Sequence, residues 1–202
     1  GEQKMVIHNP LPTSATIKAK SKVTGLVDKG ADKGALILTE RTLKDADSGL
    51  DLATLTSTTF ARGNGGYDGP SDEAPRPHKV PEREPDFAVD LTTLDMAALI
   101  YRLSGDYNPL HASPSVAKAA GFPKPILHGL CSLGVAGHAI LKGCCDYDAK
   151  RLKSLQLRFS SPVYPGEMVR TEIWRDGANI SFKSKILERD VVVLDNGHAT
   201  VE

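Results

Sequence analysis

A run of small and apolar residues, HGLCSLGVAGHAILKGC from His128 to Cys144, constrains the fold of this chain more than any other stretch. It is apolar on nearly every side, which is typical of a helix enclosed by other structure. Three or four strand-like segments follow it, namely SLQLRFSSPV, EMVRTEIWRDG, NISFKSKILE and VVVLDNGHATV. The break at RDGAN predicts a hairpin between two of them. The second half therefore combines one buried helix with an antiparallel meander.

The first half contains strand patterns without a comparable helix. Its segments KMVIH, TIKAKSKVTGLV, GALILTERTLK and LDLATLTSTTFARG are rich in β-branched residues and are broken by Gly, Asp and Lys. A buried helix followed by a meander is the element order of a hot-dog fold, in which a sheet curls around one helix. We expect an α+β tandem (double) hot dog, with an incomplete N-terminal repeat and a complete C-terminal repeat.

A proline-rich, highly charged segment separates the two halves. Proline fixes φ and lacks an N–H donor, so residues 70–90 favour an extended, solvated path. We predict a partial hot-dog unit over residues 1–69, a linker over 70–90 and a complete hot-dog domain over 91–202. A loop strapped across a neighbouring surface is the alternative reading of the linker.

Two shorter helices are expected after this segment. In TTLDMAALIYRLSG, Leu94, Ala97, Ala98 and Tyr101 fall at helical spacing, with Thr92 or Thr93 as the N-cap. A second short helix is expected near SPSVAKAAGF.

Composition excludes several functional classes. The 202 residues include 25 Lys+Arg and 25 Asp+Glu, so no global field draws the chain to nucleic acid or to a membrane surface. No apolar run is long enough to span a bilayer, and the first residues lack the pattern of a signal peptide. The three cysteines lack disulfide or zinc spacing, so we expect reduced thiols in an intracellular protein.

The segment YRLSGDYNPLH places Asp106, Asn108 and His111 close together in a turn-prone context. An ordinary Asx-type turn is the structural reading of such residues. The functional reading gains support from KPILHGL downstream, which puts Gly129 at the start of the apolar helix. Free N–H groups at a helix start can stabilise an oxyanion. A carboxylate and an imidazole beside such a site can add water across a double bond, without a metal or a redox cofactor.

At these residues the chain resembles a known family. YRLSGDYNPLH, GFPKPILHGLCSLG and RFSSPVYPGE are similar to the signature of the (R)-specific 2-enoyl-CoA hydratases (hydratase 2, MaoC-like). The likeness is closest to the hydratase unit of peroxisomal multifunctional enzyme type 2. It extends into the first half through LPTSATIKAK, LVDKGADKGALI and GNGGYDG, and so covers essentially the whole chain.

The resemblance implies roles for particular residues. Asp106 and His111 match the pair that holds the catalytic water, Asn108 helps to arrange them, and Gly129 supplies an N–H to the thioester oxygen. The acyl-CoA contacts implied are Gly1, Lys29, Asp106, Tyr107, Asn108, Pro109, Leu110, His111, Gly129 and Phe159. His8, His78, His138 and His198 match no such role, and we expect structural roles for His128 and Cys131.

The resemblance also implies an activity and a setting. We expect a hydro-lyase of fatty-acid β-oxidation that interconverts trans-2-enoyl-CoA and (3R)-3-hydroxyacyl-CoA, with no cofactor and no metal. The alternatives are a dehydratase acting on acyl groups carried by a protein, and a non-catalytic acyl-binding module. A homodimer, a place in a larger multifunctional chain and a peroxisomal location are expected by resemblance. Because the chain does not end in a peroxisomal address, a cytoplasmic location is the alternative. The family's front half begins earlier than Gly1, so an upstream segment or a second subunit should cover the first unit.

Overall fold

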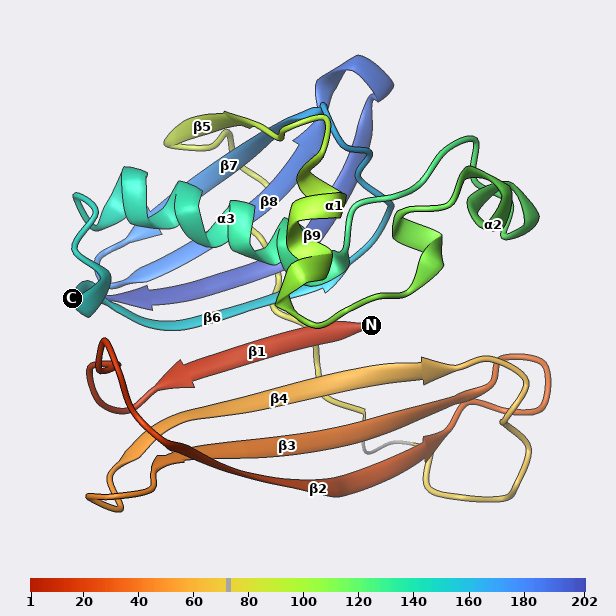
Figure 1. Cartoon of the computed structure of the whole chain (residues 1–202), viewed down its shortest axis with the longest axis horizontal. Helices are drawn as coiled ribbons and strands as arrows, with labels where there is room; N and C mark the ends of the chain where they lie inside the picture. Colours follow the sequence, from red (N-terminus) through yellow and green to blue (C-terminus); the bar gives the residue numbers. More distant parts are fainter. Residues whose placement is uncertain (72–73) are drawn as a thin grey trace.

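The computed structural model describes residues 1–71 and 74–202. Within these residues, nine strands form one antiparallel sheet in the order β2-β3-β4-β1-β6-β9-β8-β7-β5 (Figure 1). The strands are β1 (Glu2–Ile7), β2 (Ile17–Asp28), β3 (Ala35–Asp45), β4 (Asp51–Ala61), β5 (Phe87–Thr92), β6 (Leu152–Phe159), β7 (Met168–Asp176), β8 (Asn179–Ile186) and β9 (Val191–Val201). The α-helices are α1 (Ala97–Tyr101), α2 (Pro114–Ala119) and α3 (Gly129–Cys144), and the short 3₁₀ turns are η1 (Arg102–Ser104), η2 (Pro109–His111), η3 (Ala149–Arg151) and η4 (Leu187–Arg189).

Helix α3 is the centre of the main hydrophobic core. Figure 1 shows it lying across the half of the sheet built from β5 to β9. Its small residues let it approach the sheet closely: a Cβ added to Gly143 would lie 2.8 Å from Cε2 of Phe87, and one added to Gly137 would lie 3.4 Å from Cδ2 of Leu155. The predicted buried helix is confirmed on the side that faces the sheet, where its small residues pack against the strands. The expectation that it is enclosed on nearly every side was wrong, because Leu130, Gly134, His138 and Lys142 are exposed on its outer side.

Strand β1 joins the two halves of the sheet. It pairs with β4 on one side and with β6 on the other, both antiparallel, so that Met5 lies between Leu55 and Leu155. The four strand segments predicted for the first half are present, and the second half has the three or four expected after the helix as β6 to β9, with β5 in addition. The hairpin predicted at RDGAN connects β7 to β8 through Gly177, whose φ is +57°. The halves thus share one continuous sheet.

The front half leaves part of its apolar face uncovered. Ile17, Val23 and Leu26 on β2 are 46%, 61% and 49% exposed. Their partners on β3 are odd-numbered residues, which lie on the same face of the sheet as Met5. Met5 packs against the α3 core, so the three exposed side chains lie on the face that α3 covers in the other half. Among the described residues no helix covers β2 to β4, as Figure 1 makes plain. This agrees with a front repeat that has strands but no buried helix of its own.

The predicted helix around Ala98 is shorter than expected. Thr92 and Thr93 do not cap it: α1 begins at Ala97, and Met96 is its N-cap. The Thr93 side chain is used elsewhere, because its Oγ1 donates to the Glu167 carbonyl (2.9 Å) and accepts from the Gly166 N–H (3.0 Å). Leu94 consequently precedes the helix and is 63% exposed, so its assignment to the apolar face was wrong.

The proline-rich segment makes specific contacts with the sheet. Nε2 of His78 lies 2.8 Å from Oγ of Ser181, and the Asn196 side-chain amide donates to the His78 carbonyl (2.7 Å). These are contacts of a loop strapped across a neighbouring surface, the alternative reading of residues 70–90. The last residues of that range, from Phe87 on, already belong to β5, which pairs with β7.

Asp86 fixes the end of this segment to β7 and makes stability depend on pH. Its carboxylate accepts from the Arg83 guanidinium (2.9 Å for Nη2) and from the Arg175 N–H (2.7 Å), which lowers the pKa of Asp86 from 3.8 to about 2. Because the folded pKa lies below the unfolded value of about 3.9, this stabilisation is complete above that value and is lost as the pH falls from about 4 to about 2.

An Asp86→Asn variant should therefore melt at a lower temperature than the parent chain at about pH 6, with a gap that narrows as the pH falls below about 4. Thermal unfolding by circular dichroism over this range measures the gap. The same change at Asp47, on the exposed turn between β3 and β4, is the matched control. A gap that stays constant with pH would contradict this role of Asp86.

Candidate active site

Asp106 and Asn108 lie on the turn between η1 and η2. The Asp106 carboxylate accepts from the Asn108 N–H (3.2 Å), and the Asn108 side-chain oxygen accepts from the Leu110 N–H (3.0 Å) as the N-cap of η2. Each is a local Asx-type contact, so the structural reading of this segment is correct. It does not exclude the functional reading, because one carboxylate can satisfy the turn and still face a neighbouring imidazole.

The orientation of the His111 ring follows from one hydrogen bond. Its Nδ1 lies 2.8 Å from the carbonyl oxygen of Ile126, and a carbonyl oxygen only accepts hydrogen bonds. In the neutral ring Nδ1 therefore carries the proton, and Nε2 has the free lone pair. This tautomer presents His111 as a proton acceptor at Nε2.

His128 contacts both candidate residues, His111 and Asp106. Its ring stacks on His111 with centroids 3.7 Å apart and an interplanar angle of 24°, and Nε2 donates to the Asp106 carbonyl (3.1 Å). Tyr101 packs on His128 at a centroid distance of 4.7 Å. His128 is 1% exposed, and burial lowers its pKa, so the ring stays neutral. The structural role expected for His128 is thus a specific one: it holds the His111 ring and the Asp106 backbone together.

Gly129 begins α3, directly after His128 as predicted. Within the described residues its N–H has no acceptor, as expected for the first residue of a helix. A Cβ added to Gly129 would lie 3.3 Å from the Phe159 ring, so only a residue without a side chain leaves both groups undisturbed. The helix start can therefore offer an N–H beside an aromatic wall.

The remaining substrate residues expected from the sequence fall into two places. Tyr107, Pro109 and Leu110 lie on or next to η2, and the Arg102 guanidinium stands 5.5 Å from the Tyr107 ring centroid. Gly1, Lys29 and Phe159 line one cavity of about 580 Å³. Phe159 links the two places, since it touches the start of α3 and lines the cavity.

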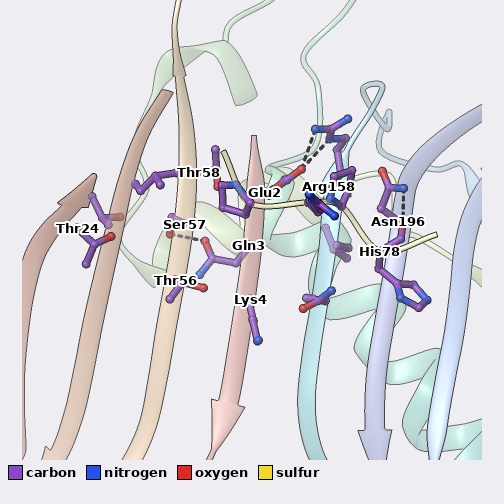
Figure 2. Close-up of a pocket in the computed structure, with 17 residues that line it drawn as sticks. Glu2, Gln3, Lys4, Thr24, Thr56, Ser57, Thr58, His78, Arg158 and Asn196 are labelled. Atoms are coloured by element: carbon purple, nitrogen blue, oxygen red, sulfur yellow. Dashed lines mark hydrogen bonds and ion pairs between the residues drawn. The ribbon is translucent and has the colours of Figure 1, made fainter. Parts of the chain in front are cut away.

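Another cavity, of about 350 Å³, contains none of the expected site residues. It is lined by residues of β1, β4 and β6 together with the strap around His78 (Figure 2). Figure 2 shows Glu2 bonded to Arg158 and Ser57 bonded to Gln3, with α3 behind the strands. Because Asp106, His111 and Gly129 do not line it, this cavity is not the candidate active site.

Asp106, His111 and His128 each offer one ligand atom, and these atoms lie within 4.8 Å of one another. Such a set resembles a metal site, but the hydrogen bonds favour acid–base chemistry. His128 Nε2 is used as a donor to the Asp106 carbonyl, and its Nδ1 is buried without a partner among the described residues. A metal would have to reach that buried nitrogen or displace the bond at Nε2. The absence of a metal stays a prediction.

The other histidines and the cysteines lie outside this arrangement. His78 packs on His198 at a centroid distance of 4.6 Å, and His138 lies near the Tyr147 hydroxyl (3.4 Å). Cys131 is partly buried on α3, and burial raises the pKa of its thiol. Cys131 is therefore poorly suited to act as a nucleophile, as the sequence suggested.

Two family models match the chain. The MaoC-like domain matches residues 77–196, and the N-terminal domain of the hydratase 2 unit of multifunctional enzyme type 2 matches residues 1–63. The chain belongs to the MaoC-like hydratase 2 family. It is 40% identical to the peroxisomal enoyl-CoA hydratase 2 of Arabidopsis thaliana, over 96% of this chain and 65% of that protein. It is also 40% identical to 3-hydroxyacyl-thioester dehydratase Y of Mycobacterium tuberculosis, over 98% of this chain and 70% of that protein.

Solved structures of other proteins support the assignment of this chain to the MaoC-like hydratase 2 family. The full-length peroxisomal multifunctional enzyme type 2 of Drosophila melanogaster superposes with a TM-score of 0.90 and 39% identity, over all of this chain and 36% of that one. A second M. tuberculosis protein, described as a double hot-dog fold, has a TM-score of 0.64 and 15% identity over 99% of this chain and 73% of that one, which supports the fold alone. The predicted double hot dog is confirmed, and the chain spans about two thirds of the Arabidopsis relative.

The hydrogen bonds of His111 and His128 predict their tautomers. His111 should be protonated at Nδ1 and His128 at Nε2, because each of these atoms faces a carbonyl oxygen. Long-range ¹H–¹⁵N correlation spectra at neutral pH distinguish the two forms, and a His111→Gln variant identifies the His111 signals. An Nε2-protonated His111 would contradict the arrangement described here.

Proposed function

We propose that this MaoC-like chain is a hydro-lyase that adds water to trans-2-enoyl-CoA and forms (3R)-3-hydroxyacyl-CoA in fatty-acid β-oxidation. One observation carries the proposal: the Asp106 carboxylate and the oriented His111 imidazole stand together at the start of α3. The Arabidopsis relative, which is 40% identical, is an enoyl-CoA hydratase 2. We assign Asp106 and His111 as the acid–base pair, Asn108 as the residue that shapes their turn, and Gly129 as the oxyanion donor.

The reaction follows from these positions. A water molecule held between Asp106 and His111 bonds through its oxygen to C3 of the enoyl group. The pair accepts one proton of the water and delivers a proton to C2, so it returns to its initial state. Negative charge on the thioester oxygen is stabilised in between by the Gly129 N–H and the start of α3. His111 is ready for this role because its Nδ1 is already occupied by the Ile126 carbonyl.

The alternative substrate is an acyl group carried by a protein. This alternative is supported by the M. tuberculosis relative, which is a 3-hydroxyacyl-thioester dehydratase. The two reactions use the same acid–base groups in opposite directions, so Asp106 and His111 do not distinguish them. Discrimination between a CoA thioester and a protein-bound acyl group must therefore depend on residues that contact the CoA or the carrier protein rather than the acyl chain.

We also infer the setting of the chain from its relatives and from its uncovered sheet face. The peroxisomal names of relatives support a peroxisomal location, with a cytoplasmic one as the alternative. The Drosophila relative is a multifunctional chain of which this one covers 36%, which supports a place in a larger protein. The exposed Ile17, Val23 and Leu26 support a homodimer or an additional segment over β2 to β4, because burying apolar area yields about 25 cal/mol per Å².

Removal of either member of the pair should abolish most activity. Asp106→Asn keeps an oxygen that can accept from the Asn108 N–H, and His111→Gln supplies an amide N–H that can donate to the Ile126 carbonyl, so both variants should fold. We expect turnover of crotonyl-CoA to fall by about 10²- to 10⁴-fold, the usual contribution of general acid–base catalysis. Loss of the enoyl-thioester absorbance measures the rate.

Matched controls are Asp47→Asn on an exposed turn and His138→Gln on the exposed side of α3. These should leave the rate within about twofold, because they lie outside the site and surface changes away from special features have small effects. A folded Asp106→Asn variant with near-normal turnover would refute the proposed function.

The product should have the 3R configuration, as the resemblance to the (R)-specific hydratases implies. A water held by Asp106 and His111 on one side of a substrate anchored at Gly129 should give a single enantiomer. Coupling the product to a dehydrogenase specific for L-3-hydroxyacyl-CoA should give no NADH until an epimerase is added. Immediate NADH formation would rule out this stereochemistry.

A further inference from the structure

The strap, residues 74–86, crosses the sheet without a ladder of backbone hydrogen bonds. Within the described part of the chain, residues 74–85 make no backbone–backbone hydrogen bond. Four of them are proline, which lacks the N–H that a ladder requires. The end of the strap is fixed at Asp86 and at Arg83, whose carbonyl accepts from Nε1 of Trp174 (2.7 Å). The rest of the strap is therefore held by side-chain contacts.

His78 attaches the middle of the strap to the sheet. Among the described residues, its two hydrogen bonds are the only ones that join residues 74–82 to the strands. One links its Nε2 to Oγ of Ser181 (2.8 Å), and the other links its carbonyl to the Asn196 amide (2.7 Å), as Figure 2 shows. Ser181 and His198 alternate with core residues along β8 and β9, so they lie on the face of the sheet that α3 does not cover.

The His78 ring packs against a second imidazole, that of His198. The ring centroids are 4.6 Å apart, and the interplanar angle is 47°. Burial lowers the pKa of both rings, and the charges of His78 and Lys4 lower the pKa of His198 further. The contact therefore joins two uncharged rings at pH 7.5, and it would place like charges side by side if both rings took up protons.

Positive charge prevails around the two rings. His198 lies opposite the uncharged Ser181 and Gln156, and Gln156 lies opposite the cation Lys4. Among the described residues, no carboxylate contributes to the pKa of either ring. Other charged groups on these strands and on the strap are the ion pairs Arg158–Glu2 (2.8 Å) and Lys183–Glu172 (3.5 Å), Asp195, which accepts from the Asn196 N–H (2.8 Å), and the cations Arg76 and Lys79.

We propose that His78 and His198 form a proton-sensitive latch, which holds the strap on the sheet while both rings are neutral and releases it when they take up protons. With the strap attached, each ring has a pKa below its ordinary value of about 6.5, so the released form binds protons more readily. The attached form is therefore fully stabilised above about pH 6.5, and this stabilisation is lost as the pH falls below that value. The window lies above that of Asp86, which begins near pH 4.

Release of the strap would change two cavities. Pro75, Arg76 and Pro77 line both the cavity of Figure 2 and the cavity that contains Phe159. Since these residues lie directly before His78, movement of the strap removes one wall of each cavity. The latch thus makes access to both cavities depend on pH.

Trypsin cleavage after the exposed Lys79 provides a local measurement, because this bond lies next to the latch. The cleavage rate of the folded chain is measured by mass spectrometry between pH 7.5 and 5.5 and is divided by that of a free peptide of residues 74–86. This ratio removes the pH dependence of the protease itself. We expect it to rise below about pH 6.5, by up to about tenfold per pH unit for each proton that release takes up. Circular dichroism over the same range should show that the whole chain stays folded.

A double variant, His78→Gln with His198→Gln, removes both titrating rings and keeps an amide that can bond Oγ of Ser181. Its cleavage ratio should not depend on pH, whereas His138→Gln on the exposed side of α3 should keep the pH dependence of the parent chain. A ratio that does not change with pH in the parent chain, or a rise that persists in the double variant, would overturn the latch. Imidazole pKa values at or above about 6.5 for His78 and His198, measured by NMR titration of the parent chain, would also overturn it. None of these measurements involves catalysis, so their outcome is independent of the proposed hydratase function.

Discussion

The pairing of β1 with β6 is the interaction on which the arrangement of this chain depends. β1 is a short strand, yet among the described residues it is the only strand that connects β2, β3 and β4 to the α3 half. Its ladder continues at the end of β6, where the Phe159 N–H donates to the Gly1 carbonyl (3.0 Å). That contact holds Phe159 between the start of α3 and the cavity of the front half. Since ladder hydrogen bonds fix register, the same pairing that unites the sheet also fixes the position of Phe159 relative to the start of α3.

The candidate site is assembled on a rigid support rather than on flexible loops. Asp106 lies between two 3₁₀ turns and His111 ends the second, but His128 at the start of α3 contacts both, through stacking on His111 and a hydrogen bond to the Asp106 carbonyl. Burial lowers the pKa of His128, which disfavours a positive charge on the ring that stacks on His111. The structural and functional readings of YRLSGDYNPLH are therefore compatible. The turn contacts fix the backbone, and the side-chain atoms of Asp106 and His111 that take no part in these contacts are available for chemistry.

The exposed apolar side chains on β2 differ in their surroundings from the exposed cations beside the Phe159 cavity. Ile17, Val23 and Leu26 continue the face that α3 covers elsewhere, so they fit a covering by protein. Arg62 and Arg76 are two of the residues that line the cavity containing Phe159, so they belong to a hollow rather than to a flat apolar face. In a double hot dog that lacks a helix in one half, both surfaces can exist because the sheet extends beyond the single helix that it encloses.

Local patterns in the sequence determined the strands, the buried helix at Gly129–Cys144 and the two sequence neighbourhoods of the site. These features depend on side-chain periodicity and on helix-start chemistry, both of which act over a few residues. The extent of the helix around Ala98 was misjudged, because Thr93 forms its hydrogen bonds with Gly166 and Glu167, far away in the chain. Only the tertiary structure decided that His128 stacks on His111, that the strap reaches Ser181 and Asn196, and that Arg62 and Arg76 share one cavity. Such contacts join residues from separate strands and loops, and their geometry depends on how the sheet curls, which no short stretch of sequence encodes.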